Sequence, residues 1–145
     1  MLKIALEMLQ ENSLCVLSTC SDHLPNSSLM HYIFDGTGMN IFMLSLRGSV
    51  KCNNITANPN VSLLIDTRAD PPQTGLPVMA LTVYGKAAIV DDLQRHQKIT
   101  GQLAEKYGSL AALAGDSRCL VIQVKIERVL LPDGISDRST VDIID

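Results

Sequence analysis

Aromatic residues are scarce in this chain: its 145 residues include three Tyr, two Phe and no Trp. So few rings leave little for the stacking platform that binds single-stranded nucleic acid. Basic residues are not in excess either, since 12 Lys and Arg stand against 15 Asp and Glu, a formal net charge of -3. A pI of about 5.5 argues against a broad electrostatic footprint for nucleic acid. We therefore expect no nucleic-acid partner.

Long apolar runs are also missing. No uninterrupted apolar stretch approaches the roughly 20 residues that a membrane span needs. Lys3 and Glu7 interrupt the apolar pattern at the N-terminus, which breaks any signal-peptide core. These two features predict a cytoplasmic protein with no membrane partner.

Cysteine occurs four times, as Cys15, Cys20, Cys52 and Cys119, but never as a Cys-x-x-Cys pair. Disulfides are rare in a reducing cytosol, and metal sites need tighter ligand clusters. We therefore expect buried free thiols and no metal site.

The composition that remains is that of a folded protein, with 46% hydrophobic and 19% charged residues. The length predicts a single domain over residues 1–145, with residues 132–145 as a short polar C-terminal tail. Hydrophobic periodicity, caps and turn residues predict three helices and six strands. The helices are expected over 2–9, 49–58 and 92–107, and the strands over 14–20, 27–34, 39–46, 61–67, 78–90 and 119–131. Asp91-Asp92 can cap the third of these helices.

Most of the expected strands follow one another through short turns. Asp35-Gly36-Thr37-Gly38 is a strong hairpin signal, and Ser21-Asp22 with Pro25 indicates another turn. Residues 69–77 hold three of the six prolines and read as a surface loop, while Gly85 is a possible kink in the strand over 78–90. This order favours a mainly β, α+β architecture, an antiparallel barrel or sheet with helices attached.

The most informative stretch runs from Met39 to Pro59. A strand ends at Ser45, a glycine-containing turn follows, and Ser49 is a good N-cap for the next helix. A helix N-terminus presents free backbone N–H groups and a partial positive charge. Together with the Ser49 hydroxyl, the Arg47 guanidinium and the Lys51 ammonium, it forms a candidate phosphate site. The spacing alone leaves a second interpretation open, a capped helix with two solvated basic residues.

Residues 45–59 read S-L-R-G-S-x-K-x-x-N-I-x-x-N-P, and V-S-L-L-I-D-T-R follows over 61–68. This pattern resembles the pyridoxamine 5'-phosphate oxidase-related, FMN-binding split-barrel family. A-L-T-V-Y-G-K-A over 80–87 and V-x-x-E-R-V over 124–129 look like later strands of that family. The likeness covers residues 2–131, and the G-S-x-K-x-x-N element is its most specific part.

The resemblance implies a six-stranded antiparallel split β-barrel with flanking helices. It also implies a homodimer that binds two FMN molecules in clefts between its subunits. Lys51 would meet the FMN phosphate, with Ser49 beside it and Arg47 in reach of the same anion. The ribityl chain and flavin ring would be lined by Ser28, Leu29, Met30, Leu44, Ser45 and Leu46. Thr82 and Tyr84 of the other subunit would close the pocket.

By the same resemblance, the protein would be an oxidoreductase acting on an unidentified small molecule. FMN would carry electrons between a reduced nicotinamide, or another donor, and a small organic acceptor.

The chain departs from the true oxidase in two places. The strand over 26–29 lacks a second basic residue, for which Arg47 or Arg68 would have to compensate. The C-terminus, ISDRSTVDIID, lacks the Arg/His motif that grips the substrate, so oxidation of pyridoxamine phosphate itself is not expected.

Several interpretations stay open at this point. The chain could be a non-catalytic FMN carrier or electron-transfer protein, or a relative that binds deazaflavin or haem. His31 is an acid in the flavin cleft, a participant in haem ligation or a structural histidine. Arg68 is either a cofactor contact or a surface ion-pair partner of Asp66 or Asp70. No Ser-His-Asp or Cys-His arrangement emerges from the sequence, which fits chemistry carried by a cofactor.

Overall fold

Eight strands and a few short helices make up the residues described by this computed structural model, 2–68, 75, 78–131 and 140–142. The helices are α1 (Leu2–Glu11), α2 (Val50–Ala57), α3 (Leu93–Lys106) and α4 (Ala111–Ala114), with a 3-10 turn, η1 (Gly108–Leu110), before α4. The strands are β1 (Leu14–Ser21), β2 (Leu24–His31), β3 (Ile33–Asp35), β4 (Asn40–Leu46), β5 (Asn60–Asp66), β6 (Ala80–Ile89), β7 (Cys119–Leu130) and β8 (Thr140–Asp142). The loop expected over 69–77 and most of the tail expected over 132–145 lie outside the described residues.

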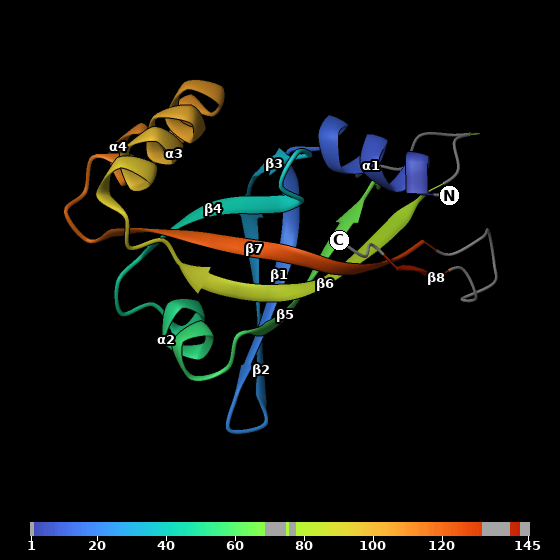
Figure 1. Ribbon diagram of the computed structural model, residues 1–145, viewed down its shortest axis with the longest axis horizontal. Coiled ribbons are helices and arrows are strands. Elements are labelled where there is room, and N and C mark those ends of the chain that lie inside the picture. Colours follow the sequence, from blue (N-terminus) through green and yellow to red (C-terminus); the bar gives the residue numbers. More distant parts are fainter. Residues whose placement is uncertain (1, 69–74, 76–77, 132–139, 143–145) are drawn as a thin grey trace.

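All strand pairs are antiparallel, in the order β2-β1-β5-β6-β7-β4-β3, with β8 added to β7. The two ends of this order, β2 and β3, are separated in the chain by Tyr32 alone. The sheet must therefore curl until its ends meet at this residue. This curled, mainly β sheet with flanking helices confirms the fold class expected from the sequence, and Figure 1 shows its strongly bent strands.

The expected number of six strands is wrong. Seven strands form the continuous path, and β8 pairs with Arg128–Leu130 of β7. The strand expected over 27–34 begins at Leu24 and is interrupted at Tyr32, where the chain changes its partner from β1 to β4. The three-residue β8 lies in the expected tail and is too short to carry a periodic pattern.

The first hairpin turn is tighter than expected. Asp22 and His23 form it, with φ angles of 51° and 63°, and strand pairing resumes at once between Ser21 and Leu24. Pro25 therefore lies within β2, opposite Cys20, and not in the turn. Proline is tolerated there because β2 is at one end of the strand order, where a missing N–H breaks no ladder bond.

The predicted helix caps are confirmed. The Ser49 hydroxyl accepts a hydrogen bond from the Cys52 backbone N–H at 3.3 Å. The Asp92 carboxylate accepts from the backbone N–H groups of Gln94 and Arg95 and begins α3. Both helices start at these residues because a capping side chain satisfies N–H groups that lack an intrahelical partner.

Gly85 does not end the strand that contains it. β6 runs from Ala80 to Ile89, and its pairing with β7 shifts register between Tyr84 and Gly85. A Cβ atom at Gly85 would overlap the backbone carbonyl oxygen of Lys125. The glycine thus allows the close approach of two backbones at an irregularity in the sheet.

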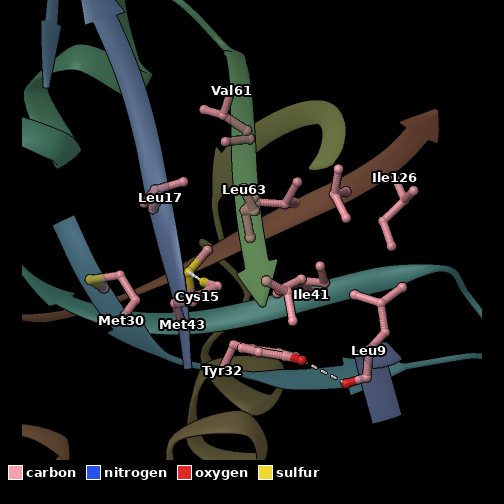
Figure 2. Packing of buried hydrophobic residues seen from close by; sticks show 14 of the residues in the cluster. Leu9, Cys15, Leu17, Met30, Tyr32, Ile41, Met43, Val61, Leu63 and Ile126 are labelled. Atoms are coloured by element: carbon pink, nitrogen blue, oxygen red, sulfur yellow. Dashed lines mark hydrogen bonds between the residues drawn. The ribbon is translucent and has the colours of Figure 1, made fainter. Parts of the chain in front are cut away.

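The main core fills the concave face of the curled sheet (Figure 2). Tyr32, which is 1% exposed, donates a 2.7 Å hydrogen bond from its hydroxyl to the Leu9 carbonyl and so ties α1 to the strand break. A second, smaller cluster joins the other face of β4 and β7 to α3.

Cys15, Cys52 and Cys119 are buried free thiols, as expected, and Cys20 is half-buried. Among the described residues, no helix has the length and apolar character to cross a membrane.

Candidate functional site

A cavity of about 320 Å³ lies where the ends of β2 and β4 meet the start of α2 and the η1–α4 segment. It is lined by Leu29, Met30, His31, Leu44, Ser45, Leu46, Ser49, Lys51, Leu110 and Leu113. All of these except His31, Leu110 and Leu113 were predicted from the sequence as cofactor-site residues. The fold thus brings residues 29–30, 44–46 and 49–51 together around one space.

The turn between β4 and α2 sets the polar end of this cavity. Gly48 has a φ of 85°, a left-handed conformation that favours glycine, and the Ser49 N–H donates to the Leu46 carbonyl at 3.1 Å. This tight reversal places Ser49 at the N-cap of α2. The N-terminus of α2 therefore lies at the cavity, and its backbone dipoles favour a negative charge there.

Two hydroxyl groups lie together at the same end. The Ser45 and Ser49 Oγ atoms are 3.0 Å apart, and Ser45 is only 3% exposed. The Ser49 oxygen already accepts from the Cys52 N–H, so its proton is available to Ser45 or to a bound acceptor. The half-buried Lys51 lines the same cavity and adds a positive charge. Two hydroxyls, an ammonium and a helix N-terminus make this end suited to an anion such as phosphate.

The rest of the lining, apart from His31, is apolar. Leu44 contributes from β4, while Leu110 and Leu113 contribute from the η1–α4 segment. Sequence reasoning missed both of these leucines because they lie more than fifty residues beyond the motif over 45–59 and belong to no recognised pattern. The signal that could have found them is their spacing of three residues, which is typical of one face of a short helix.

His31 forms part of the wall and is held by an aromatic contact. Its ring centroid lies 4.5 Å from that of Tyr107, at an interplanar angle of 32°. Tyr107 is fixed in turn, because its hydroxyl donates a 2.6 Å hydrogen bond to the Tyr32 carbonyl. The His31 Nδ1 atom is buried and has no hydrogen-bond partner within the part of the chain that the structure describes. Met30 points into the core, so His31 takes the other face of β2.

Ser28 and Arg47 were also predicted for the site, but neither lines the cavity. Ser28 is half-buried in β2, and its hydroxyl accepts from the Asn26 side-chain amide at 3.3 Å. Arg47 is exposed in the turn after β4, where its backbone N–H donates to the Arg118 carbonyl at 2.8 Å. Their roles in cofactor binding stay predictions.

Thr82 and Tyr84 lie on the convex face of β6, half-buried, because Leu81 and Val83 take the core face. The Arg128 guanidinium carbon is 4.4 Å from the centroid of the Tyr84 ring. These side chains do not reach the cavity of their own chain, and their expected contact with a partner's cofactor stays a prediction.

Arg68 forms one of the two alternatives expected for it, a surface ion pair with Asp66. Its Nε atom lies 3.1 Å from Asp66 Oδ1.

The protein's own side chains offer little covalent chemistry. Burial raises the pKa of Cys15 to about 12 and also raises the pKa of Cys119, so neither thiol forms a nucleophilic thiolate near neutral pH. The described ranges contain no group of three or more His, Cys, Asp or Glu side chains arranged to hold a metal ion. What the cavity can do is bind an anion with an apolar body.

Comparison with known proteins agrees with this architecture. A family model described as pyridoxamine 5'-phosphate oxidase matches residues 1–131. A comparison with curated protein sequences finds no match. Among solved structures, the General Stress Protein 26 from Bacillus anthracis is 20% identical, with 95% of each chain covered and a TM-score of 0.72.

Two other similar structures carry names that refer to different cofactors. An FAD-binding protein from Mesorhizobium loti is 18% identical with a TM-score of 0.72, covering 88% of this chain and 90% of that one. The heme storage protein HutZ from Vibrio cholerae is 19% identical with a TM-score of 0.72, covering 89% and 92%. At these identities, the likeness establishes the split-barrel fold.

Fold and family model together define the class: this is a split-barrel protein. The chain belongs to the pyridoxamine 5'-phosphate oxidase family, as its match over residues 1–131 establishes. The resemblance seen in the sequence is therefore confirmed at the level of the family.

Proposed function

We propose that this protein binds FMN in the cavity between β2, β4 and α2 and acts as an oxidoreductase on a small molecule. One observation carries the proposal: two hydroxyls, a cation and a helix N-terminus gather at a cavity whose other lining residues, apart from His31, are apolar. This polarity matches a molecule that has a phosphate at one end and a flat ring system at the other.

The phosphate would lie at the N-terminus of α2. Ser49 and Lys51 would donate hydrogen bonds to it, and Ser45 would hold the Ser49 hydroxyl in position through their 3.0 Å contact. The flavin ring would lie against Leu44, Leu110 and Leu113, where apolar walls exclude water from its reacting face. When bound, FMN supplies electron and hydride transfer, and the protein supplies binding and orientation.

A homodimer would complete the site. Leu29, which lines the cavity, is 69% exposed, so its side chain is accessible to a partner. The convex face of β6 offers Thr82 and Tyr84 to a partner, as the family resemblance implies. We propose that a second copy covers the rim and contributes these two side chains to the bound cofactor. We further propose a reduced nicotinamide as the electron donor.

Haem is the second candidate cofactor, and a specific observation favours it. The buried Nδ1 of His31 lacks a hydrogen-bond partner among the described residues, and this ring lines the cavity. A neutral imidazole nitrogen is a common ligand of haem iron. One of the similar structures is named a heme storage protein.

Spectroscopic titration separates these candidates. FMN binding should quench flavin fluorescence and saturate at one FMN per subunit, with a micromolar or tighter dissociation constant. Haemin should give no saturable Soret shift, and His31→Ala should leave the FMN affinity within about threefold. If haemin gives a saturable Soret band that is lost in His31→Ala, and FMN does not bind, the cofactor of this site is haem and not FMN. Stopped-flow mixing of the FMN complex with NADH or NADPH then distinguishes an oxidoreductase, which is reduced, from a carrier, which is not.

A further inference from the structure

A second cavity, of about 570 Å³, is lined by α3 and lies apart from the proposed cofactor site. It opens between α3, β3 and the start of β4, and it shares no lining residue with the first cavity. Both phenylalanines of the chain, Phe34 and Phe42, line it, together with Ile33 and Ile99. This site has an aromatic and aliphatic floor, which is notable in a chain with so few rings.

The wall supplied by α3 is basic. Arg95, Lys98 and Lys106 all line the cavity, spaced three and eight residues apart so that they share one helical face. Asp35 is the one acidic residue in the lining, and its carboxylate accepts from the Thr37 N–H. Three cations minus one carboxylate leave a charge of +2 here, in a protein whose formal net charge is -3.

Within the described residues, no ion pair neutralises these cations. The three pairs of the described residues involve Arg68, Lys86 and Arg118 instead. Arg95 is held in place through neutral contacts, since its Nη2 donates to Gln123 Oε1 at 2.8 Å. Lys106 lies 5.3 Å from the centroid of the Tyr107 ring. Their positive charge therefore remains available to an incoming anion.

An apolar recess continues from this basic wall. A neighbouring cavity, also of about 570 Å³, has a mostly apolar surface and is lined by Leu2, Lys3, Leu6, Glu7, Gln10, Phe34 and Gly36. It shares Gln10 and Phe34 with the basic cavity, so the two adjoin at those side chains. Figure 1 shows β3 between the α3–α4 pair and α1. Phe34 of β3 lines both cavities.

From this arrangement we propose that the face between α1 and α3 binds an amphipathic carboxylate, such as a medium-chain acyl anion. The carboxylate lies against Arg95 and Lys98, and the chain crosses Phe34 into the recess beside Leu2 and Leu6. Charge at one end and an apolar channel at the other select a ligand with both properties, because either half alone gains only part of the binding energy. The site is independent of the cofactor cavity and of its proposed occupant.

Isothermal titration of the purified full-length protein with decanoate tests this proposal. We expect saturable binding of decanoate, and at least tenfold weaker binding of uncharged decanol and of short butanoate. The double variant Arg95→Gln/Lys98→Gln should lose at least tenfold in decanoate affinity, the effect of removing charge-assisted contacts. Its FMN affinity should not change, which separates this result from the fate of the cofactor proposal.

The control removes the same charges elsewhere. Lys86→Gln/Arg118→Gln replaces one exposed Lys and one exposed Arg outside both cavities, and it should bind decanoate within twofold of the parent. Leu2→Ser, at a side chain that is 38% exposed, should weaken decanoate more than butanoate without unfolding the protein. The proposal is overturned if decanoate does not bind, if decanol binds equally well, or if the control variant loses as much affinity as Arg95→Gln/Lys98→Gln.

Discussion

The hydroxyl groups of Ser45 and Ser49 lie 3.0 Å apart. Their contact joins β4, near its end, to the N-cap of α2. The Ser49 hydroxyl thus serves two partners, the Ser45 side chain and the Cys52 N–H. Ser49 Oγ therefore has a structural role, capping the helix, and a proposed role, holding the phosphate. The two roles can be separated by comparison with another cap.

Ser49→Ala should lower both stability and FMN affinity. Losing the cap costs about 1 kcal/mol of unfolding free energy, and the proposed phosphate loses a donor. Asp92→Ala is the matched control, since Asp92 caps α3 in the same way but does not line the cavity. Chemical denaturation and FMN titration of both variants check this. Equal FMN affinities in Ser49→Ala and Asp92→Ala would show that Ser49 acts only as a cap.

Gly85→Ala should destabilise the sheet. The added Cβ meets the Lys125 backbone and the Val124 side chain, and backbone cannot move aside without breaking the β6–β7 ladder. Overpacking of this kind costs about 1–3 kcal/mol. Gly101→Ala is the control, because that glycine lies inside α3 with open space around it and should gain about 0.5–1 kcal/mol. Thermal or urea unfolding measures both, and a neutral Gly85→Ala would contradict the close approach.

The raised pKa of the buried Cys15 thiol predicts that the protein loses stability at alkaline pH. Burial raises its pKa from 9.0 to about 12, so between these values the unfolded chain gives up the thiol proton while the folded chain keeps it. The contribution to stability is therefore constant below pH 9 and falls as the pH rises toward 12. The pKa of the buried Tyr32 hydroxyl is also raised, which adds to the fall above pH 10.

Urea unfolding between pH 8 and pH 11 measures this slope. Cys15→Ala should be less stable than the parent at pH 8 because of the cavity it leaves. Its free energy of unfolding should fall less steeply with pH, because up to one proton fewer is released on unfolding. Parallel slopes in the parent and Cys15→Ala would rule out Cys15 as a source of the pH dependence.

Local signals predicted most of the fold. The N-caps at Ser49 and Asp92 were visible because capping depends on a single side chain next to a helical pattern. The break at Tyr32 was not, because residues 27–34 are continuously strand-like in the sequence and only the change of partner from β1 to β4 divides them. Strand pairing is non-local, so no window of sequence contains that information.

The site divides in the same way. Leu44 to Lys51 follow one another along the chain, and their motif made them predictable. Leu110 and Leu113 reach the cavity from a distant segment through packing alone. The basic face of α3 was present in the sequence as Arg95, Lys98 and Lys106, but its aromatic floor comes from β3 and β4, which only the folded chain brings beside it.

The most direct test of the account compares FMN with riboflavin, which lacks the phosphate, by titration of the parent protein and of Lys51→Gln. The parent should prefer FMN at least tenfold, the scale of a charge-assisted contact of about 1.5–3 kcal/mol. In Lys51→Gln the preference should shrink by about tenfold, through weaker FMN binding and unchanged riboflavin binding. Equal affinities for FMN and riboflavin in the parent, or an unaltered preference in Lys51→Gln, would contradict a phosphate site at the N-terminus of α2.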